Sequence, residues 1–156
     1  MESVPTATRK MIIFQLDEEE YAIPVNQIGS IERLMPITRV PQTAPFVKGV
    51  INLRGVVIPV IDLRLRFNLQ DSDLDGNKRI IIVNIHDMEV GLIVDSANDV
   101  IDIAEDKIEP APEVIDTVDV GYIDGVAKIE SRLLILLNLH KILSLQELNE
   151  MHALEG

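Results

Sequence analysis

The chain of 156 residues contains no cysteine and no tryptophan, and aromatic residues make up only 3% of it. The absence of cysteine excludes disulfide bonds, thiolate metal sites and thiol nucleophiles. Because aromatic residues are so few, the core has to be aliphatic, and a hydrophobic content of 47% is enough to build one. The composition predicts one domain, or two small domains that share a core, and it fits a reducing cytoplasm.

Long apolar runs and basic clusters are also missing. No run approaches the ~20 residues of a membrane span, and the first ten residues, MESVPTATRK, lack the apolar stretch and cleavage site of a secretory signal. The net charge of −12 argues against binding to nucleic acid or to an anionic membrane surface. A partner protein with basic patches would be attracted, although net charge usually serves only to keep a protein in solution.

Residues that could bind a metal are scattered. Three histidines fall in a predicted turn, a helix and the tail, without the spacing of metal ligands, and we interpret them as surface residues: His86, His140 and His152. The segment Asp71–Gly76 begins like a calcium loop, but its twelfth position is Ile82 instead of a bidentate carboxylate. An acidic turn is the favoured interpretation, and no metal or cofactor is expected.

Catalytic motifs are equally scarce. The serines lack a G-x-S-x-G setting, and no glycine-rich phosphate loop is present. Asp95 and Asp99, with Asp102 nearby, could in principle act as acid and base. Asn98 indicates a turn between the first two, so turn or helix-capping roles are favoured. The sequence therefore gives little support for an enzyme.

The stretch Gly49–Leu63 is the clearest local signal in the chain. Two runs of Val, Ile and Leu flank Arg54-Gly55, which predicts two strands joined by a tight turn. Gly55 can take the positive φ that such a hairpin requires. Pro59 has no N–H for a ladder, so its strand should lie at an edge or bend there. Arg54 then stands at the tip of an apolar hairpin.

Apolar patterning predicts the other elements. A short turn of helix near Pro24–Gln27 should lead into a strand, and Asp62 and Asn138 should cap helices at Leu63–Phe67 and Leu139–Leu145. Further strands are expected at Met11–Leu16, Tyr21–Val25, Arg79–Ile85, Met88–Asp95, Val100–Ile103, Val120–Ile129 and Arg132–Leu137. Loops are expected at Met35–Pro45, Leu69–Lys78 and Glu105–Val118.

An internal repeat organises these elements. Shifted by 76 residues, Gly49–Leu63 lies on Gly125–Leu139 without a gap, and Lys10–Asn26 lies on Lys78–Asp95 with one extra residue. Each half, about 10–67 and 78–143, thus has a hairpin, a bridge, a second hairpin and a capped helix. Small closed barrels remove exposed sheet edges, so we expect two barrels packed together with a groove between them.

Several segments together carry a family resemblance: Glu20–Ile23, Pro45–Gly55, Pro59, Asp62–Arg64, Val90–Asp95, Asn98–Val100, Ile108–Pro112 and Leu133–Leu143. The N-L-R-G segment in its hairpin setting is specific, and the likeness covers about residues 10–145. In these segments the sequence resembles the CheW family of bacterial chemotaxis coupling proteins. Residues 1–9 would be a flexible lead and 146–156 a C-terminal helix or tail.

The resemblance implies a mainly β fold of two interlaced, SH3-like, five-stranded barrels with short helices. It implies no enzyme activity and no cofactor. The implied role is to couple the cytoplasmic tips of methyl-accepting chemoreceptors to the histidine kinase CheA. The kinase carries its own CheW-like regulatory domain, and such domains alternate with CheW in rings.

The resemblance also implies binding residues. Those expected to face the receptor are Ile28, Ser30, Gly49, Val50, Asn52, Leu53 and Arg54. Arg54 matches the family arginine needed for receptor coupling, and Gly49 and Asn52 match its neighbours. Ile28 matches an aliphatic position, whereas Ser30 replaces a glutamate found in some members. The apolar residues would grip a receptor helix while Arg54 supplies a fork of donors.

A second surface would face the kinase, and we place it near Phe67 and Arg79 at the end of the second barrel. Three alternatives remain open. The chain could be a CheV-like adaptor, which a length of 156 residues disfavours because it leaves no room for a receiver domain. It could be an excised kinase regulatory domain, which an initiating Met1 disfavours. It could also be an enzyme with acidic residues on a barrel rim.

Overall fold

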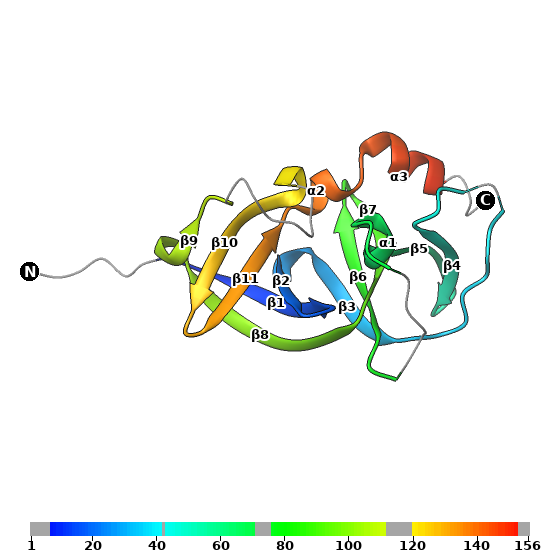
Figure 1. Ribbon diagram of the computed structural model, residues 1–156. Coiled ribbons are helices and arrows are strands. Elements are labelled where there is room, and N and C mark those ends of the chain that lie inside the picture. Colours follow the sequence, from blue (N-terminus) through cyan, green and yellow to red (C-terminus); the bar gives the residue numbers. More distant parts are fainter. Residues whose placement is uncertain (1–6, 42, 71–75, 112–119, 153–156) are drawn as a thin grey trace, which may run out of the picture.

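The computed structural model describes residues 7–41, 43–70, 76–111 and 120–152 and folds them mainly into strands (Figure 1). The strands are β1 (Thr8–Leu16), β2 (Glu19–Pro24), β3 (Ile28–Arg33), β4 (Val47–Leu53), β5 (Val56–Asp62), β6 (Arg79–Ile85), β7 (Met88–Val94), β8 (Ser96–Ala104), β9 (Ile108–Glu109), β10 (Ile123–Ile129) and β11 (Arg132–Leu137). The helices are η1 (Val25–Gln27), α1 (Leu63–Arg66), η2 (Glu105–Lys107), η3 (Val120–Tyr122), α2 (Leu139–Ile142) and α3 (Leu145–His152). Within the described ranges, no helix is long and apolar enough to cross a membrane.

The strands form two sheets of matching topology. One has the order β8-β1-β2-β11-β10-β9 and the other β3-β6-β7-β5-β4. In each sheet the first hairpin of one half pairs in parallel with the second hairpin of the other half, through β2–β11 and β5–β7. Each sheet therefore draws strands from both halves of the chain, which confirms the expected interlaced fold.

Three clusters of buried side chains hold the sheets together. One cluster is formed by side chains of the six-stranded sheet and includes Ile13 and Leu134. Another is formed by side chains of the five-stranded sheet and includes Ile58 and Ile82. The largest cluster lies between the sheets and takes residues from both. Along β6 the side chains point alternately into the cluster of the five-stranded sheet and into the large central cluster. This explains why the strand is apolar on both faces.

Local sequence signals explain the turns and helix starts. Arg54 and Gly55 have φ of 53° and 87°, which closes the tight hairpin between β4 and β5. The side chains of Asp62 and Asn138 accept hydrogen bonds from the backbone N–H groups of Arg64 and His140, so both predicted caps are confirmed. Pro59 pairs with β4, while the pairing of β5 with β7 starts at Val60, so Pro59 needs no donor on that side.

Some boundaries differ from the expected ones. The strand expected at Val100–Ile103 is the longer β8, because it pairs along most of β1. The loop expected at Glu105–Val118 begins with η2 and β9, and β9 pairs with β10. The helix expected at Leu139–Leu145 ends at Ile142, and a separate helix, α3, follows. The extent of β8 and the presence of β9 depend on pairing with strands that are distant in the sequence, and the local pattern does not reveal such pairing.

Candidate functional site

Arg54 stands alone as a cation at the tip of the β4–β5 hairpin. Its side chain is 74% exposed, and its guanidinium lies 3.8 Å from a carboxylate oxygen of Glu32 on β3. The strand order places β3 and β4 at opposite edges of the five-stranded sheet. The Arg54–Glu32 contact therefore shows that the sheet curls until its two edges approach each other.

The backbone at Arg54 is in an unfavourable conformation for this residue type. Most of the other non-glycine residues with positive φ are short and polar: Asp17, Asn68, His86 and Asp87. Such side chains tolerate this region, whereas a long one gains nothing there and the conformation costs about 1 kcal/mol. Local strain that persists at an exposed tip points to a role for the side chain itself.

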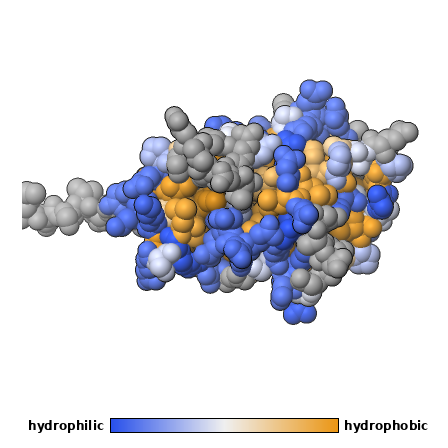
Figure 2. All heavy atoms as spheres, in the orientation of Figure 1, coloured by the Kyte–Doolittle hydropathy of each residue, from blue (hydrophilic) through white to orange (hydrophobic). Residues whose placement is uncertain are grey.

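Apolar side chains are exposed close to this tip. Val56 and Val57 follow the turn directly, and Ile31 precedes Glu32 on β3. We define the hairpin-tip surface as Ile31, Glu32, Arg54, Val56 and Val57. In Figure 2, hydrophobic residues are visible over β4 at one end of the molecule and over β10 and β11 at the other. The surface combines apolar contact area with one cation, which is the composition of a protein-binding patch.

The predicted binding residues on β4 have structural tasks as well. The side chain of Asn52 accepts a hydrogen bond of 2.8 Å from the N–H of Gly55 and so fixes the turn. Gly49 is buried, and Val50 exchanges two backbone hydrogen bonds with Thr38. Leu53 packs against the core of the five-stranded sheet. Of these residues on β4, only Asn52 is fully exposed beside Arg54.

The predicted residues on β3 lie farther from the tip. Ile28 is half-buried and packs against the large central cluster, and Ser30 is half-buried in the middle of the strand. Glu32 touches Arg54, and Ile28 lies four residues earlier, which is about 13 Å along an extended strand. The structure therefore does not bring Ile28 and Arg54 into one contact site. A partner would have to span the distance between them.

The expected second surface requires a correction. Phe67 is 5% exposed and packs between the rings of Tyr21 and Tyr122, with ring centroids 5.8 and 5.7 Å away. It belongs to the central core, where it follows the last residue of α1, and it cannot contact a partner directly. Arg79 is half-buried and donates hydrogen bonds to the carbonyl oxygens of Gly76 and Lys78.

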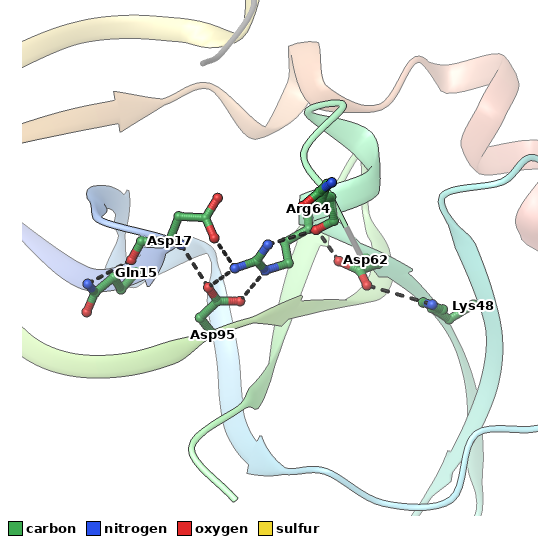
Figure 3. A network of polar contacts seen from close by, with 7 residues as sticks. Gln15, Asp17, Lys48, Asp62, Arg64 and Asp95 are labelled. Carbon is green, nitrogen blue, oxygen red and sulfur yellow. Dashed lines mark hydrogen bonds and ion pairs between the residues drawn. The ribbon is translucent and has the colours of Figure 1, made fainter. Parts of the chain in front are cut away.

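A buried arginine links the two sheets (Figure 3). Arg64 of α1 donates two hydrogen bonds, of 2.7 and 2.8 Å, to the carboxylate of Asp95, and it also pairs with Asp17 in the β1–β2 turn. A fourth hydrogen bond of 2.7 Å goes to the carbonyl oxygen of Gln70. Asp95 in turn accepts a hydrogen bond from the backbone N–H of Asp17. These bonds hold the turn of one sheet against the helix that follows the other.

This network controls the acidity of Asp95. Burial by itself would raise the pKa of this carboxyl, but hydrogen bonds from Arg64 and from the N–H of Asp17, together with the charge of Arg64, lower the pKa below its ordinary value. In the same way, the hydrogen bond from Arg132 lowers the pKa of Glu20. Both carboxylates therefore favour the folded state while they are ionised.

A pH dependence of stability follows. Because the pKa of Asp95 is lower in the folded state, its contribution is complete above its unfolded pKa of about 3.9 and is lost as the pH falls through the folded value. We expect the free energy of unfolding to decrease progressively as the pH falls below about 5. Urea titrations at each pH measure this decrease, and Asp95→Asn should reduce it. An equal decrease in this variant would assign the effect to other groups.

The structure gives evidence on two roles considered for acidic residues, the acid–base pair of Asp95 and Asp99 and the calcium-like segment Asp71–Gly76. Asp95 and Asp99 do not form an acid–base pair, since each binds a different arginine, Arg64 and Arg132. Ile82, at the twelfth position of the calcium-like segment, is a buried residue of β6 and cannot ligate a cation. Residues 71–75 of that segment lie outside the described ranges.

The sequence interpretation missed three kinds of residue. Glu32, the partner of Arg54, is separated from it by 22 positions and carried no local signal. Val56 and Val57 belong to an apolar run that predicts a buried strand, but these first two residues of the run are exposed. His86 and His140, interpreted as separate surface residues, have their rings in contact.

Comparisons with known proteins agree with this architecture. The model of the CheW-like domain family matches residues 10–147. The chain is 48% identical over 134 residues to the chemotaxis protein CheW of Bacillus subtilis, covering 86% of each chain. It is 38% identical over 143 residues to the chemotaxis protein CheW of Klebsiella aerogenes, covering 92% of this chain and 86% of that one.

A solved structure supports the same assignment. The scaffolding protein TtCheW from Thermoanaerobacter tengcongensis superposes with a TM-score of 0.83 at 38% identity, covering 90% of this chain and 96% of that one. The topology, the exposed hairpin arginine and these matches lead to one conclusion. The chain belongs to the CheW family of chemotaxis proteins.

Proposed function

We propose that the protein is a non-catalytic adaptor that couples methyl-accepting chemoreceptors to the histidine kinase CheA on the cytoplasmic side of the membrane. One observation carries this proposal: Arg54 is held exposed on a strained turn, and exposed apolar residues follow it on β5 and precede its partner Glu32 on β3. This arrangement suits the binding of another protein. Family membership and the names of the relatives supply the chemotaxis context.

The receptor would bind at the hairpin-tip surface. A receptor tip is a helical coiled coil, and such a helix is held by a few apolar anchors and a polar clamp. Val56 and Val57 supply anchors, and Arg54 supplies the clamp. The ion pair of Arg54 with Glu32 is long and exposed on the Arg54 side, so its loss should cost little, and a receptor carboxylate or carbonyl can take the place of Glu32.

An adaptor also needs a second surface. Arg79, at the start of β6, remains our proposed kinase-facing residue, whereas Phe67 is withdrawn because it is buried. The far end of the six-stranded sheet exposes Val100 and Leu133. Two separate exposed apolar patches would allow two partners, including a second copy in rings, to bind at the same time.

Arg54→Ala should weaken receptor binding by about 1–3 kcal/mol, if the residue acts as a hot spot. Its thermal midpoint should stay close to that of the wild type, because the lost ion pair is exposed. Binding is measured by co-sedimentation with receptor fragments and CheA, followed by kinase activity, and stability is measured by a thermal melt.

Arg9→Ala is the matched control, since Arg9 also forms one exposed ion pair, with Glu105, but lies far from the hairpin tip. It should leave receptor binding unchanged. If Arg54→Ala loses stability to the same extent as binding, Arg54 has a structural role and the proposal fails.

A further inference from the structure

His86 and His140 form an exposed pair outside the surfaces described above. Their ring centroids are 4.6 Å apart, and the rings meet edge to face at 61°. His86 lies in the turn between β6 and β7, and His140 lies in α2. Both side chains are exposed, so the pair is open to solvent. In Figure 1, β6 ends beside α2, which brings these distant segments together.

The internal repeat shows that this contact is built into the fold. His86 occupies the same place in its turn as Asp17 does between β1 and β2, with φ of 51° and 54°. His140 follows Asn138 and Leu139 just as Arg64 follows Asp62 and Leu63. Asp17 and Arg64 form an ion pair. In both halves the fold therefore brings a turn residue against the second residue of a short capped helix.

The chemistry of the two contacts differs. In the first half, opposite charges attract each other. In the second half, two imidazole rings meet edge to face, a contact that is favourable for aromatic rings but involves no pair of opposite charges. Imidazole nitrogens are good ligands for Zn²⁺, Ni²⁺ and Cu²⁺.

We propose that His86 and His140 form a two-histidine site for a divalent transition metal. The described part of the chain holds no group of three or more metal-ligating side chains, so water would complete the coordination. A bound ion would link the β6–β7 turn of one sheet to the helix that follows the other. It would do in the second half what the Asp17–Arg64 ion pair does in the first.

Metal titration of the purified full chain tests the proposal. After treatment with a chelator, the protein is titrated with ZnCl₂ near pH 7.5 by calorimetry, and its thermal midpoint is measured with and without Zn²⁺. We expect one ion per chain and a rise of the midpoint with metal. His86→Asn and His140→Gln should each weaken binding by at least about tenfold and abolish the rise.

The design includes its own controls. Asparagine tolerates the positive φ at position 86, and melts without metal show whether each variant is folded. The chain has three histidines, so His152→Gln is the matched control and should bind Zn²⁺ like the wild type. Undiminished binding by the double variant of His86 and His140, or one ion shared by two chains, would overturn the proposal.

Discussion

Gly49→Ala should destabilise the fold by about 3–5 kcal/mol, far more than a typical surface substitution. Two costs combine at this position. The backbone has φ of +143°, which a residue with a Cβ adopts only under strain. A Cβ built there would also lie 2.0 Å from the carbonyl oxygen of Thr38, where no such contact is possible. Urea unfolding measures the loss.

Alanine substitutions at two other glycines measure the backbone strain and the steric clash separately. Gly55 has φ of +87° but nothing lies within 4 Å of its Cβ position, so Gly55→Ala should cost only about 1 kcal/mol. At Gly125, the repeat equivalent of Gly49, a Cβ would lie 2.7 Å from the carbonyl oxygen of Glu109. Gly125→Ala should fall between the other two. If Gly49→Ala costs no more than Gly55→Ala, the close approach to Thr38 is not what requires glycine.

This result would also define how Gly49 acts in binding. Gly49 is buried and presents no side chain to a partner, so any loss of receptor binding in Gly49→Ala would follow from the disturbed hairpin. Binding expressed per folded molecule, determined from the same unfolding curves, distinguishes this indirect effect from the direct effect expected for Arg54→Ala.

The features that were predictable from the sequence depend on neighbouring residues. The turn at Gly55, the caps at Asp62 and Asn138, and the turn of helix before β3 are encoded within a few positions. The repeat was visible for a similar reason, since the same local signals occur twice in the same order. The structure reproduces it in the matched strand order of the two sheets.

The features that escaped prediction depend on residues far apart in the chain. The parallel pairs β2–β11 and β5–β7 join strands from the two halves of the chain, and no local sequence pattern predicts them. The sequence places Phe67 at the end of a short helix, but the rings of Tyr21 and Tyr122 that pack against it come from distant parts of the chain. The same pattern places Arg64 only in that helix, and its partners Asp17 and Asp95 are 47 and 31 positions away.

Arg64→Met should destabilise the protein by about 2–4 kcal/mol. The arginine side chain is only 10% exposed, and its nitrogens bind Asp95, Asp17 and a backbone carbonyl. Methionine fills similar space but leaves two neighbouring carboxylates without their cation. The partial exposure of Asp95 and Asp17 keeps the cost below that of a fully buried pair.

Arg79→Met is the matched control for this substitution. Arg79 is hydrogen-bonded like Arg64 but only half-buried, and its acceptors are the carbonyl oxygens of Gly76 and Lys78, which lie within three residues of it. Among the described residues, its removal leaves no carboxylate without a hydrogen-bonded partner, so we expect a loss below about 1 kcal/mol. Arg64→Lys should recover only part of the stability, because an ammonium cannot make the two parallel bonds to Asp95.

A double-mutant cycle decides whether the cost of Arg64→Met comes from the unpaired charge. In Arg64→Met/Asp95→Asn one of the two uncompensated carboxylates is gone and only that of Asp17 remains, so the double variant should be less unstable than the sum of the two single variants, by about 1–2 kcal/mol. Exact additivity would mean that Arg64 acts through packing, and the link between the two sheets would then be apolar. A coupling that weakens as the pH falls through the lowered pKa of Asp95 would place the attraction on this ion pair.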